Sequence, residues 1–383
     1  MPAALRASRR RHPATWQMVL LAEFEKDPAL RVHVILLRRE VERAFDFERH
    51  GTVFHVLKAA PWLRLASLFW VDTLLIGRVC RRLEPDLVHA WGMERGAPLV
   101  ANRLRRPYVM TVQGLLGWYR QQVPMARYER FLERFEPRCL RRAAVVTTES
   151  NYAVTYLRER YPGLRIQQAE HAPNLAFFQV RRRPQVQPLR LISVGTLGFR
   201  KGTDLLFQAL DRLRPELAFT LEVICGPDLG YLARVRPMVS PALWQRVEFK
   251  QHLLPQEVAR ELETATLMLL PTRADVSPNA VKESVVAGVP VVAASTGGVP
   301  DYVFPGRNGL LFPPGDLDGF VAALRTAAQH PAFSRGEVDA AALAQCREYL
   351  SPARMARNFL SAYRLAGFKR PLAGASPEKG GSG

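Results

Sequence analysis

Residues 189–213 read LRLISVGTLGFRKGTDLLFQALDRL, so an apolar run, a turn with glycines and a segment of helical period follow one another. The apolar run predicts a buried strand at 191–194, and the spacing of the leucines predicts a helix at 204–213. A strand that passes through a tight turn into a helix is the unit of parallel sheets covered by helices. We therefore expect an α/β fold.

The same alternation fills the first half of the chain, where it predicts one doubly wound domain over residues 1–174. Strands are expected at 32–37, 53–57, 87–90, 108–112 and 144–148, and helices at 15–25, 62–82, 125–142 and 152–160. Residues 175–190 follow neither period and contain Pro184 and Pro188, which predicts a linker.

A second doubly wound domain is expected over residues 191–349. Further strands are expected at 220–225, 247–250, 266–270 and 290–294, followed by a hairpin of 302–303 with 310–312 around Asn308-Gly309, and further helices at 255–264, 280–287 and 317–327. A last helix is expected at 350–365, within a segment 350–370. Residues 371–383 are rich in Gly, Ser and Pro, and we expect a flexible tail.

Composition bounds the class of protein. A chain of 383 residues that is 48% hydrophobic is long enough for two cores, which excludes a disordered chain. Its four cysteines are far apart, which predicts no zinc or disulfide framework and a reducing cytoplasm. The N-terminus lacks the apolar core of a secretory signal, and charges interrupt the longest apolar stretch, 61–80, so no transmembrane helix is expected.

The charge is uneven. The formal net charge is +19, and residues 1–190 carry 33 basic and 17 acidic side chains. A basic half favours an acidic partner, such as an anionic membrane surface or a phosphate-bearing acceptor. An arginine-rich composition without such a partner is the alternative. No nucleic-acid-reading motif accompanies the charge, so no nucleic-acid partner is expected.

The glycine turn of the opening stretch is the first candidate site. Gly195, Thr196, Gly198, Arg200 and Lys201 place backbone amides and two cations at the start of a helix. Such a turn is suited to a diphosphate. An ordinary turn with solvated cations is the alternative. The spacing matches neither the dinucleotide fingerprint nor the Walker motif.

A second candidate site is Asp275-Val276-Ser277-Pro278-Asn279-Ala280-Val281-Lys282-Glu283. A helix that begins near Asn279 puts Glu283 one turn in, while Asp275 stays in the preceding loop. Alternatively, Ser277 or Asn279 caps the helix and Glu283 forms a surface ion pair. With the glycine turn, these residues suit a nucleotide diphospho-sugar, whose phosphates need cations and whose hydroxyls need carboxylates.

Residues 191–316 resemble the donor half of the GT-B glycosyltransferases, specifically the large retaining family numbered four. Asp275 to Glu283 is similar to that family's E-x7-E motif with Asp at the first position, and Gly297-Gly298 and Pro314-Gly315-Asp316 follow in family order. The resemblance implies two Rossmann-like domains that face a cleft, with the C-terminal helix crossing back to the first, acceptor-binding domain.

The resemblance also implies roles for residues. Glu283 would hold the donor ribose, and Arg200 and Lys201 would stabilise the leaving diphosphate. The transferred sugar would be held by Asp275 and by the backbone of Ser277, Pro278, Asn279 and Ala280. His12 would lie in the acceptor loop. No metal or other cofactor is implied.

Two departures from the family pattern concern the cleft. The chain has Thr196 where the family usually has Arg, and Gln113 where the family commonly has His. The activity that the resemblance implies is a retaining transfer of a hexose from a UDP- or GDP-linked donor to a saccharide or lipid-linked acceptor. The implied setting is cell-surface polysaccharide synthesis, and the implied location is the cytoplasm or, peripherally, the inner face of the cytoplasmic membrane. A catalytically impaired scaffold and a nucleotide-sugar epimerase are the alternatives.

The segment 61–82 leaves two interpretations open. Its apolar residues include Trp62, Leu65, Leu68 and Leu74, and Arg64 and Arg78 accompany them. A helix of this kind either lies on a membrane surface or packs into the first domain, and periodicity alone does not distinguish a core from a bilayer.

Overall fold

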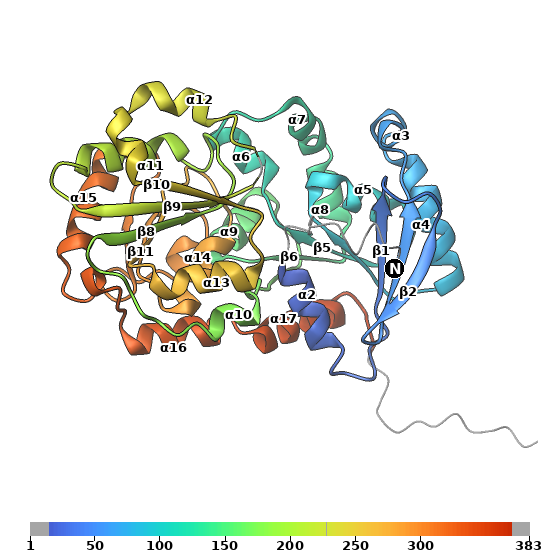
Figure 1. Ribbon diagram of the computed structural model, residues 1–383. Coiled ribbons are helices and arrows are strands. Elements are labelled where there is room, and N and C mark those ends of the chain that lie inside the picture. Colours follow the sequence, from blue (N-terminus) through green and yellow to red (C-terminus); the bar gives the residue numbers. More distant parts are fainter. Residues whose placement is uncertain (1–14, 227, 370–383) are drawn as a thin grey trace, which may run out of the picture.

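The computed structural model describes residues 15–226 and 228–369, and Figure 1 shows two α/β domains side by side. The strands of the first domain are β1 (His33–Arg38), β2 (Phe45–Arg49), β3 (Thr52–Lys58), β4 (Val88–Trp91), β5 (Tyr108–Val112), β6 (Val145–Thr148) and β7 (Ile166–Gln168). Its helices are α2 (Thr15–Phe24), α3 (Pro61–Ala66), α4 (Trp70–Leu83), α5 (Ala97–Arg103), α6 (Leu116–Gln122), α7 (Arg127–Glu133), α8 (Glu136–Arg142) and α9 (Asn151–Arg160), with a 3₁₀ turn η1 (Met93–Arg95).

The expected strands of this half are present, but their pairing differs from a single doubly wound sheet. Within the described residues, β4, β5, β6 and β7 form one parallel sheet, while β1, β3 and β2 form a separate one. β2 was not expected, and it pairs antiparallel with β3 through a short turn. Its alternating Phe45 and Phe47 are the period-two signal that the sequence analysis missed.

The helix expected at 62–82 is interrupted. Leu68 and Phe69 adopt left-handed backbone angles, with φ of 49° and 64°, and separate α3 from α4. Phe69 is buried against Gly96, where an added Cβ would lie 2.5 Å from the phenyl ring. Burial of this ring compensates for the unfavourable backbone angles. The helix expected at 125–142 is likewise divided, into α7 and α8.

The second domain contains one six-stranded parallel sheet in the order β10-β9-β8-β11-β12-β13. The strands are β8 (Leu189–Val194), β9 (Phe219–Cys225), β10 (Val247–Gln251), β11 (Leu267–Leu270), β12 (Val291–Ala294) and β13 (Gly309–Phe312). The helices are α10 (Leu175–Phe178), α11 (Thr203–Leu213), α12 (Leu232–Val235), α13 (Pro255–Thr264), α14 (Asn279–Ala287), α15 (Leu317–Gln329), α16 (Ala340–Tyr349) and α17 (Pro352–Leu365), with short 3₁₀ turns η2 (Arg236–Met238), η3 (Pro241–Arg246), η4 (Val299–Asp301) and η5 (Phe333–Arg335). The strand–turn–helix unit of the opening stretch is β8 followed by α11.

The prediction of a hairpin around Asn308-Gly309 was wrong. Residues 302–303 form no strand, and β13 instead pairs parallel with β12. The buried Asn308 side chain organises the turn, because its Oδ1 accepts from the Phe304 amide at 2.6 Å and its Nδ2 donates to the Tyr302 carbonyl at 2.9 Å. These bonds satisfy backbone groups that a hairpin partner would otherwise satisfy.

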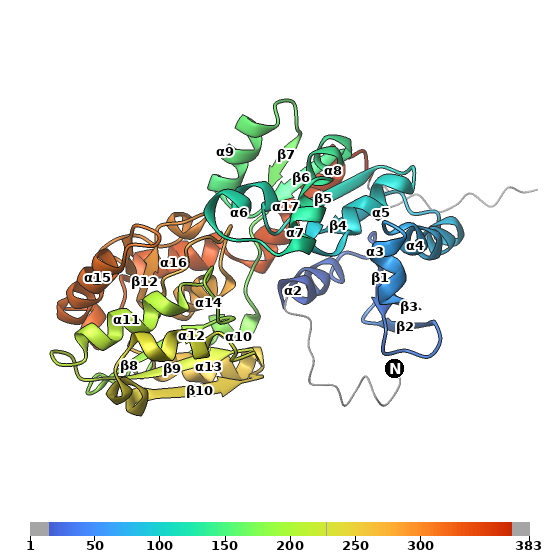
Figure 2. The same ribbon diagram turned by 90° about the horizontal axis from the view of Figure 1, so that it is seen from above.

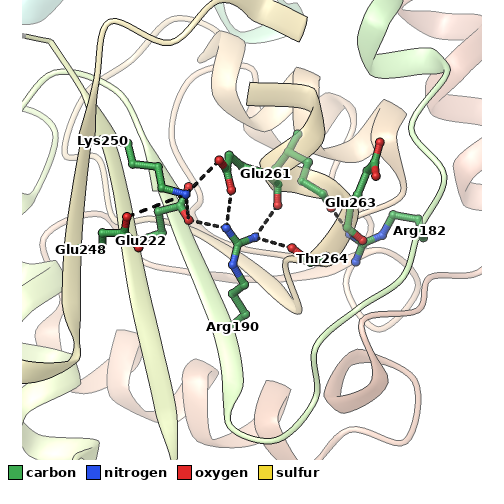
Figure 3. Close-up of polar contacts among 9 residues, drawn as sticks. Arg182, Arg190, Glu222, Glu248, Lys250, Glu261, Glu263 and Thr264 are labelled. Atoms are coloured by element: carbon green, nitrogen blue, oxygen red, sulfur yellow. Dashed lines mark hydrogen bonds and ion pairs between the residues drawn. The ribbon is translucent and has the colours of Figure 1, made fainter. Parts of the chain in front are cut away.

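A cluster of charged side chains lies between strands β8, β9 and β10 and helix α13, as Figure 3 shows. The guanidinium of Arg190 on β8 contacts the carboxylates of Glu222 on β9 and Glu261 on α13, the latter at 2.6 Å. Lys250 on β10 contacts the same two carboxylates at 3.0 and 2.9 Å. These pairs join three strands to a helix by opposite charges that compensate one another.

Residues 175–190, expected as a linker, lie on the second domain. The guanidinium of Arg182 donates to several backbone carbonyls there, including those of Ala265 at 2.6 Å and Gly336 at 3.0 Å. The amide of Arg183 donates to the carbonyl of Glu263 at 2.7 Å. Because α10 also contacts α13 and α14, the segment is anchored to the second domain along its length.

The last helix returns to the first domain. α17 contacts α2, β6 and β7, and Figures 1 and 2 place it against that domain. Asn358 donates to Glu170 at 2.9 Å, and the hydroxyl of Tyr363 lies 2.8 Å from Nδ1 of His89. Burial lowers the pKa of His89 to about 3. His89 is therefore a half-buried, hydrogen-bonded residue between β4 and α17, and the expected return of the C-terminal helix is confirmed.

A buried ion pair joins the two domains where α14 meets the end of β6. Lys282 on α14 is 1% exposed, and its Nζ lies 2.6 Å from Oε2 of Glu149, which is 6% exposed. Nδ1 of His171 lies 3.1 Å from the same oxygen, and Trp16 stacks on the imidazole at 3.6 Å. Burial opposes ionisation of Glu149, but His171 and Lys282 outweigh it and hold the pKa of the carboxyl below its usual value.

None of the helices in residues 15–226 and 228–369 combines the length and apolar character needed to cross a bilayer.

We expect Lys282→Met to lower the free energy of unfolding by about 3–5 kcal/mol, because it leaves Glu149 buried without its ammonium partner. Replacing both partners, by Lys282→Met with Glu149→Leu, is expected to cost less than the single change. Denaturant unfolding measures both. Lys26→Met, which removes an exposed pair with Glu23, is the control and is expected to cost at most about 1 kcal/mol. Equal midpoints for Lys282→Met and this control would contradict the role of the buried pair.

Candidate functional site

The candidate site lies at the carboxyl ends of β8 and β11, which are neighbours in the second sheet. The loops that follow them, 195–202 and 271–278, are joined by hydrogen bonds. The carbonyl of Arg200 accepts from the Arg273 amide at 2.8 Å and from the Thr272 hydroxyl at 3.0 Å. Ligands of open parallel sheets bind at this edge.

Close backbone contacts at two glycines fix the 271–278 loop against the first loop and against the segment that follows β12 (Val291–Ala294). At Gly202, with φ of 69°, an added Cβ would lie 1.8 Å from the Pro271 carbonyl oxygen. At Gly297, with φ of 52°, it would lie 1.9 Å from the carbonyl oxygen of Asp275. Only glycine combines this backbone angle with so close an approach. Arg273 adds a bidentate ion pair to Asp204 on α11, at 2.7 and 2.6 Å.

The structure brings Asp275, Lys201 and Arg200 together. Oδ2 of Asp275 lies 2.5 Å from Nζ of Lys201 and 3.4 Å from Nη1 of Arg200. Asp275 is buried, which opposes its ionisation, but the two cations outweigh the burial and lower its pKa. The two cations are therefore paired with the carboxylate, and neither is freely solvated.

Glu283 is a carboxylate without such compensation. It lies half-buried in the second turn of α14, and among the described residues no donor reaches its carboxylate. Burial raises the pKa of Glu283 to about 8, despite the opposing effect of Lys282. The alternative of a surface ion pair is therefore wrong. A half-buried carboxylate that no described residue donates to is suited to accept hydrogen bonds from ligand hydroxyls.

The loop between the two carboxylates does not cap α14 through a side chain. Pro278 is the N-cap residue and forms no side-chain hydrogen bond. Ser277 is buried, with its hydroxyl 3.3 Å from that of Tyr302, while Asn279 is exposed and Ala280 is half-buried. The capping alternative for Ser277 and Asn279 is therefore not observed, and the first amides of α14 carry no cap.

The structure places three of the four remaining predicted site residues. Gly195, Thr196 and Gly198 lie in the first loop, where Thr196 is exposed and the Gly198 amide donates to Thr203 Oγ1 at 2.9 Å. His12 lies outside the described residues.

Two residues of the first domain that the sequence analysis missed lie next to this site. The ring of Tyr119 on α6 is 5.2 Å from the guanidinium of Arg200. The carboxylate of Glu94, just after β4, lies against Gly92 and Gly114, where an added Cβ would be 2.2 and 2.8 Å from its oxygens. Burial raises the pKa of Glu94. Both residues follow strands of the first sheet, and that position was the available signal.

Comparison with protein families gives a match for each domain. A model described as glycosyl transferases group 1 matches residues 188–330, and one described as glycosyltransferase family 4 matches residues 23–173. The sulfoquinovosyl transferase of Arabidopsis thaliana is 28% identical over 64% of this chain and 50% of its own length. An amylovoran biosynthesis glycosyltransferase of Erwinia amylovora is 30% identical over 40% of this chain and 38% of its own. The chain thus spans half or less of these relatives.

Solved structures give the fold. Sucrose-phosphate synthase from Thermosynechococcus elongatus superposes with a TM-score of 0.75 and 18% identity over 90% of this chain and 91% of that one. Anabaena HepE in complex with UDP-glucose superposes with a TM-score of 0.68 and 17% identity over 93% of this chain and 97% of that one. These similarities confirm the expected pair of Rossmann-like domains.

The raised pKa of Glu283 predicts how stability depends on pH. A carboxyl whose pKa is about 8 in the folded state, against an ordinary 4.5, favours folding when protonated. That contribution is complete below the unfolded pKa and is lost as the pH rises through the folded one. We expect Glu283→Gln to have a higher Tm than the wild type above about pH 8, with the difference shrinking toward about pH 5.

Thermal unfolding across this pH range measures the difference. Glu248→Gln is the matched control, because Glu248 has a side chain that is 69% exposed. If the Tm difference between Glu283→Gln and the wild type is as independent of pH as that of the control, the raised pKa of Glu283 is refuted.

Proposed function

Because the chain is a family-4-like glycosyltransferase of the GT-B type, we propose that it transfers a hexose from a UDP- or GDP-linked donor to a saccharide or lipid-linked acceptor with retention of anomeric configuration. Two features that follow the carboxyl ends of β8 and β11 carry this proposal. Glu283 is a carboxylate whose pKa is raised by burial, and Asp275 is a carboxylate that contacts the cations of Lys201 and Arg200.

Glu283 supports the ribose part of the proposal. The two neighbouring hydroxyls of a ribose donate to the two oxygens of one carboxylate. Inside the half-buried first turns of α14, these bonds would replace the water that Glu283 loses on burial. They favour the ionised form, so donor binding would lower the pKa of Glu283 and release a proton near neutral pH.

Lys201 and Arg200 support the diphosphate part. Both cations now contact Asp275, and a diphosphate that enters the loop would compete with this carboxylate for them. As the cations turn toward the phosphates, Asp275 becomes available to the hydroxyls of the transferred sugar. The uncapped amides of α14 favour negative charge at the same place.

The chemistry follows from this charge distribution. Departure of the nucleoside diphosphate puts negative charge on the oxygen that leaves the anomeric carbon, and Lys201 and Arg200 would stabilise it. In the retaining course, the acceptor hydroxyl attacks from the side of the leaving group and its proton passes to the departing phosphate. We propose that these side chains supply the positive charge and that no metal is required.

The relatives support the wider setting. HepE binds UDP-glucose, and the Erwinia relative acts in amylovoran biosynthesis. We propose that this chain acts in the synthesis of a cell-surface polysaccharide, in the cytoplasm or on the inner face of its membrane. Glu94 and Tyr119 would form the acceptor side of the cleft, opposite Arg200.

The donor site is tested by calorimetry and thermal shift with UDP, GDP and ADP in the presence of EDTA. We expect one of them to bind the wild type and raise its Tm, and Glu283→Ala to weaken binding at least about tenfold. Glu248→Ala, at an exposed position of the same domain, is the control and should bind normally. Heats measured in buffers of different ionisation enthalpy should reveal proton release in the wild type and in Glu248→Ala, but not in Glu283→Ala.

Three outcomes count against the proposal. If no nucleotide binds, the donor site is not functional and the chain acts as a scaffold. Binding that disappears in EDTA would show that a metal is needed. Conversion of a nucleotide sugar to its epimer without an acceptor would indicate an epimerase.

The competition at Asp275 gives a separate prediction. Asp275→Asn removes the charge that holds Lys201 and Arg200 and keeps the oxygen that accepts from the Ser277 amide. We expect this variant to bind the nucleoside diphosphate roughly three- to tenfold more tightly than the wild type. The increase in affinity from the nucleoside diphosphate to the nucleotide sugar should be smaller for the variant than for the wild type. Calorimetry with both ligands measures this, with Asp318→Asn, at an 88% exposed side chain, as the control. Weaker binding of the diphosphate alone would contradict the exchange.

A further inference from the structure

The exposed surface of α3 and α4 is unusually apolar. Trp62, Leu65 and Leu68 are 75%, 42% and 43% exposed, and Trp70 and Leu74 on α4 are 53% and 56% exposed. These five large side chains fall within thirteen consecutive residues. Single exposed apolar residues are normal, whereas a cluster of this kind marks a contact surface.

This apolar surface is held in a fixed shape. Phe69 anchors the turn between the helices in the core against Gly96. Arg103 donates to the Leu68 carbonyl at 2.6 Å and stacks over the Trp70 ring at 4.3 Å. Arg64 pairs with the buried Asp72 at 2.7 Å. The outward position of the apolar side chains is therefore built into the fold.

Basic residues continue the same face. On α4, Trp70, Leu74, Arg78 and Arg81 fall within about 80° of one another around the helix axis. Arg78, Arg81 and Arg82 are all exposed, and the one acidic residue of α3 and α4, Asp72, is buried. Of the neighbouring acids, Asp46 pairs with Arg82 at 3.1 Å, and Glu84 lies exposed beyond the C-terminal end of α4.

We propose that α3 and the exposed face of α4 dock on an anionic lipid surface, with Trp62, Leu65 and Leu74 entering the interface and Arg78 and Arg81 facing acidic headgroups. Tryptophan and leucine beside arginine match an interface that is apolar below and negatively charged above. In Figures 1 and 2 these helices lie at the end of the molecule remote from the second domain, so docking leaves the donor site uncovered. The inference rests on the proposed function only for the lipid-linked acceptor that this surface would bring within reach.

Flotation with vesicles of phosphatidylcholine, with and without phosphatidylglycerol, tests the proposal on the full chain. We expect binding only when phosphatidylglycerol is present and weaker binding at high salt. Trp62→Ser with Leu65→Ser should reduce binding about tenfold or more. Met238→Ser with Leu365→Ser is the matched control, because these residues are 50% exposed on other elements, and it should bind like the wild type.

Two further measurements separate the apolar and basic contributions. Arg78→Ser with Arg81→Ser should reduce the dependence on phosphatidylglycerol and salt. Lipids brominated in the acyl chain should quench the fluorescence of the wild type and quench Trp62→Phe less.

The proposal is overturned if the wild type does not bind vesicles that contain phosphatidylglycerol, or if the Trp62 and Leu65 substitutions leave binding unchanged. It is also overturned if those substitutions instead dissociate a homo-oligomer, because the surface would then contact a second copy of the chain. Two controls separate a failure of this proposal from a failure of the donor site. Trp62→Ser with Leu65→Ser should still bind the nucleotide, and Glu283→Ala should still bind vesicles.

Discussion

The buried contact between Lys282 and Glu149 is the constraint on which the arrangement of the two domains depends. An ammonium group excluded from water is tolerated only beside an opposite charge, so the start of α14 must meet the end of β6. The next residue on α14 is Glu283, which lies about 100° further around the helix and has no such partner within the part of the chain that the structure describes. The side chain that joins the domains thereby sets the orientation of the helix that presents the free carboxylate.

The segments that follow β8 and β11 thus contain two carboxylates in opposite electrostatic states. Asp275 is held ionised by Lys201 and Arg200, whereas burial without a donor raises the pKa of Glu283 to about 8. A ligand with phosphates and hydroxyls would compete with Asp275 for its cations and supply donors to Glu283. Donation to Glu283 favours binding of such a ligand, whereas the ion pairs of Asp275 with Lys201 and Arg200 oppose binding of its phosphates.

Most strands and helices were predictable, because apolar periodicity reflects which face each element buries. The predictions failed where side chains far away in the chain intervene. Phe69 breaks a continuous helical pattern by reaching the space at Gly96, and Asn308 satisfies backbone groups that a hairpin would have paired. In the candidate site, Glu94 and Tyr119 were missed because no spacing along the chain relates them to Arg200.

The sequence by itself determined the α/β class, the two domains and the residues of the two candidate loops, 195–202 and 271–278, because these follow from local periodicity and from motifs within short segments. Only the tertiary structure decided that Lys201 and Arg200 pair with Asp275, that no donor from residues 15–226 or 228–369 reaches Glu283, and that Trp62 and Leu74 face outward. Charge state and exposure depend on which atoms surround a side chain and exclude water from it. Those atoms come from elements distant in the sequence, so the folded chain alone specifies them.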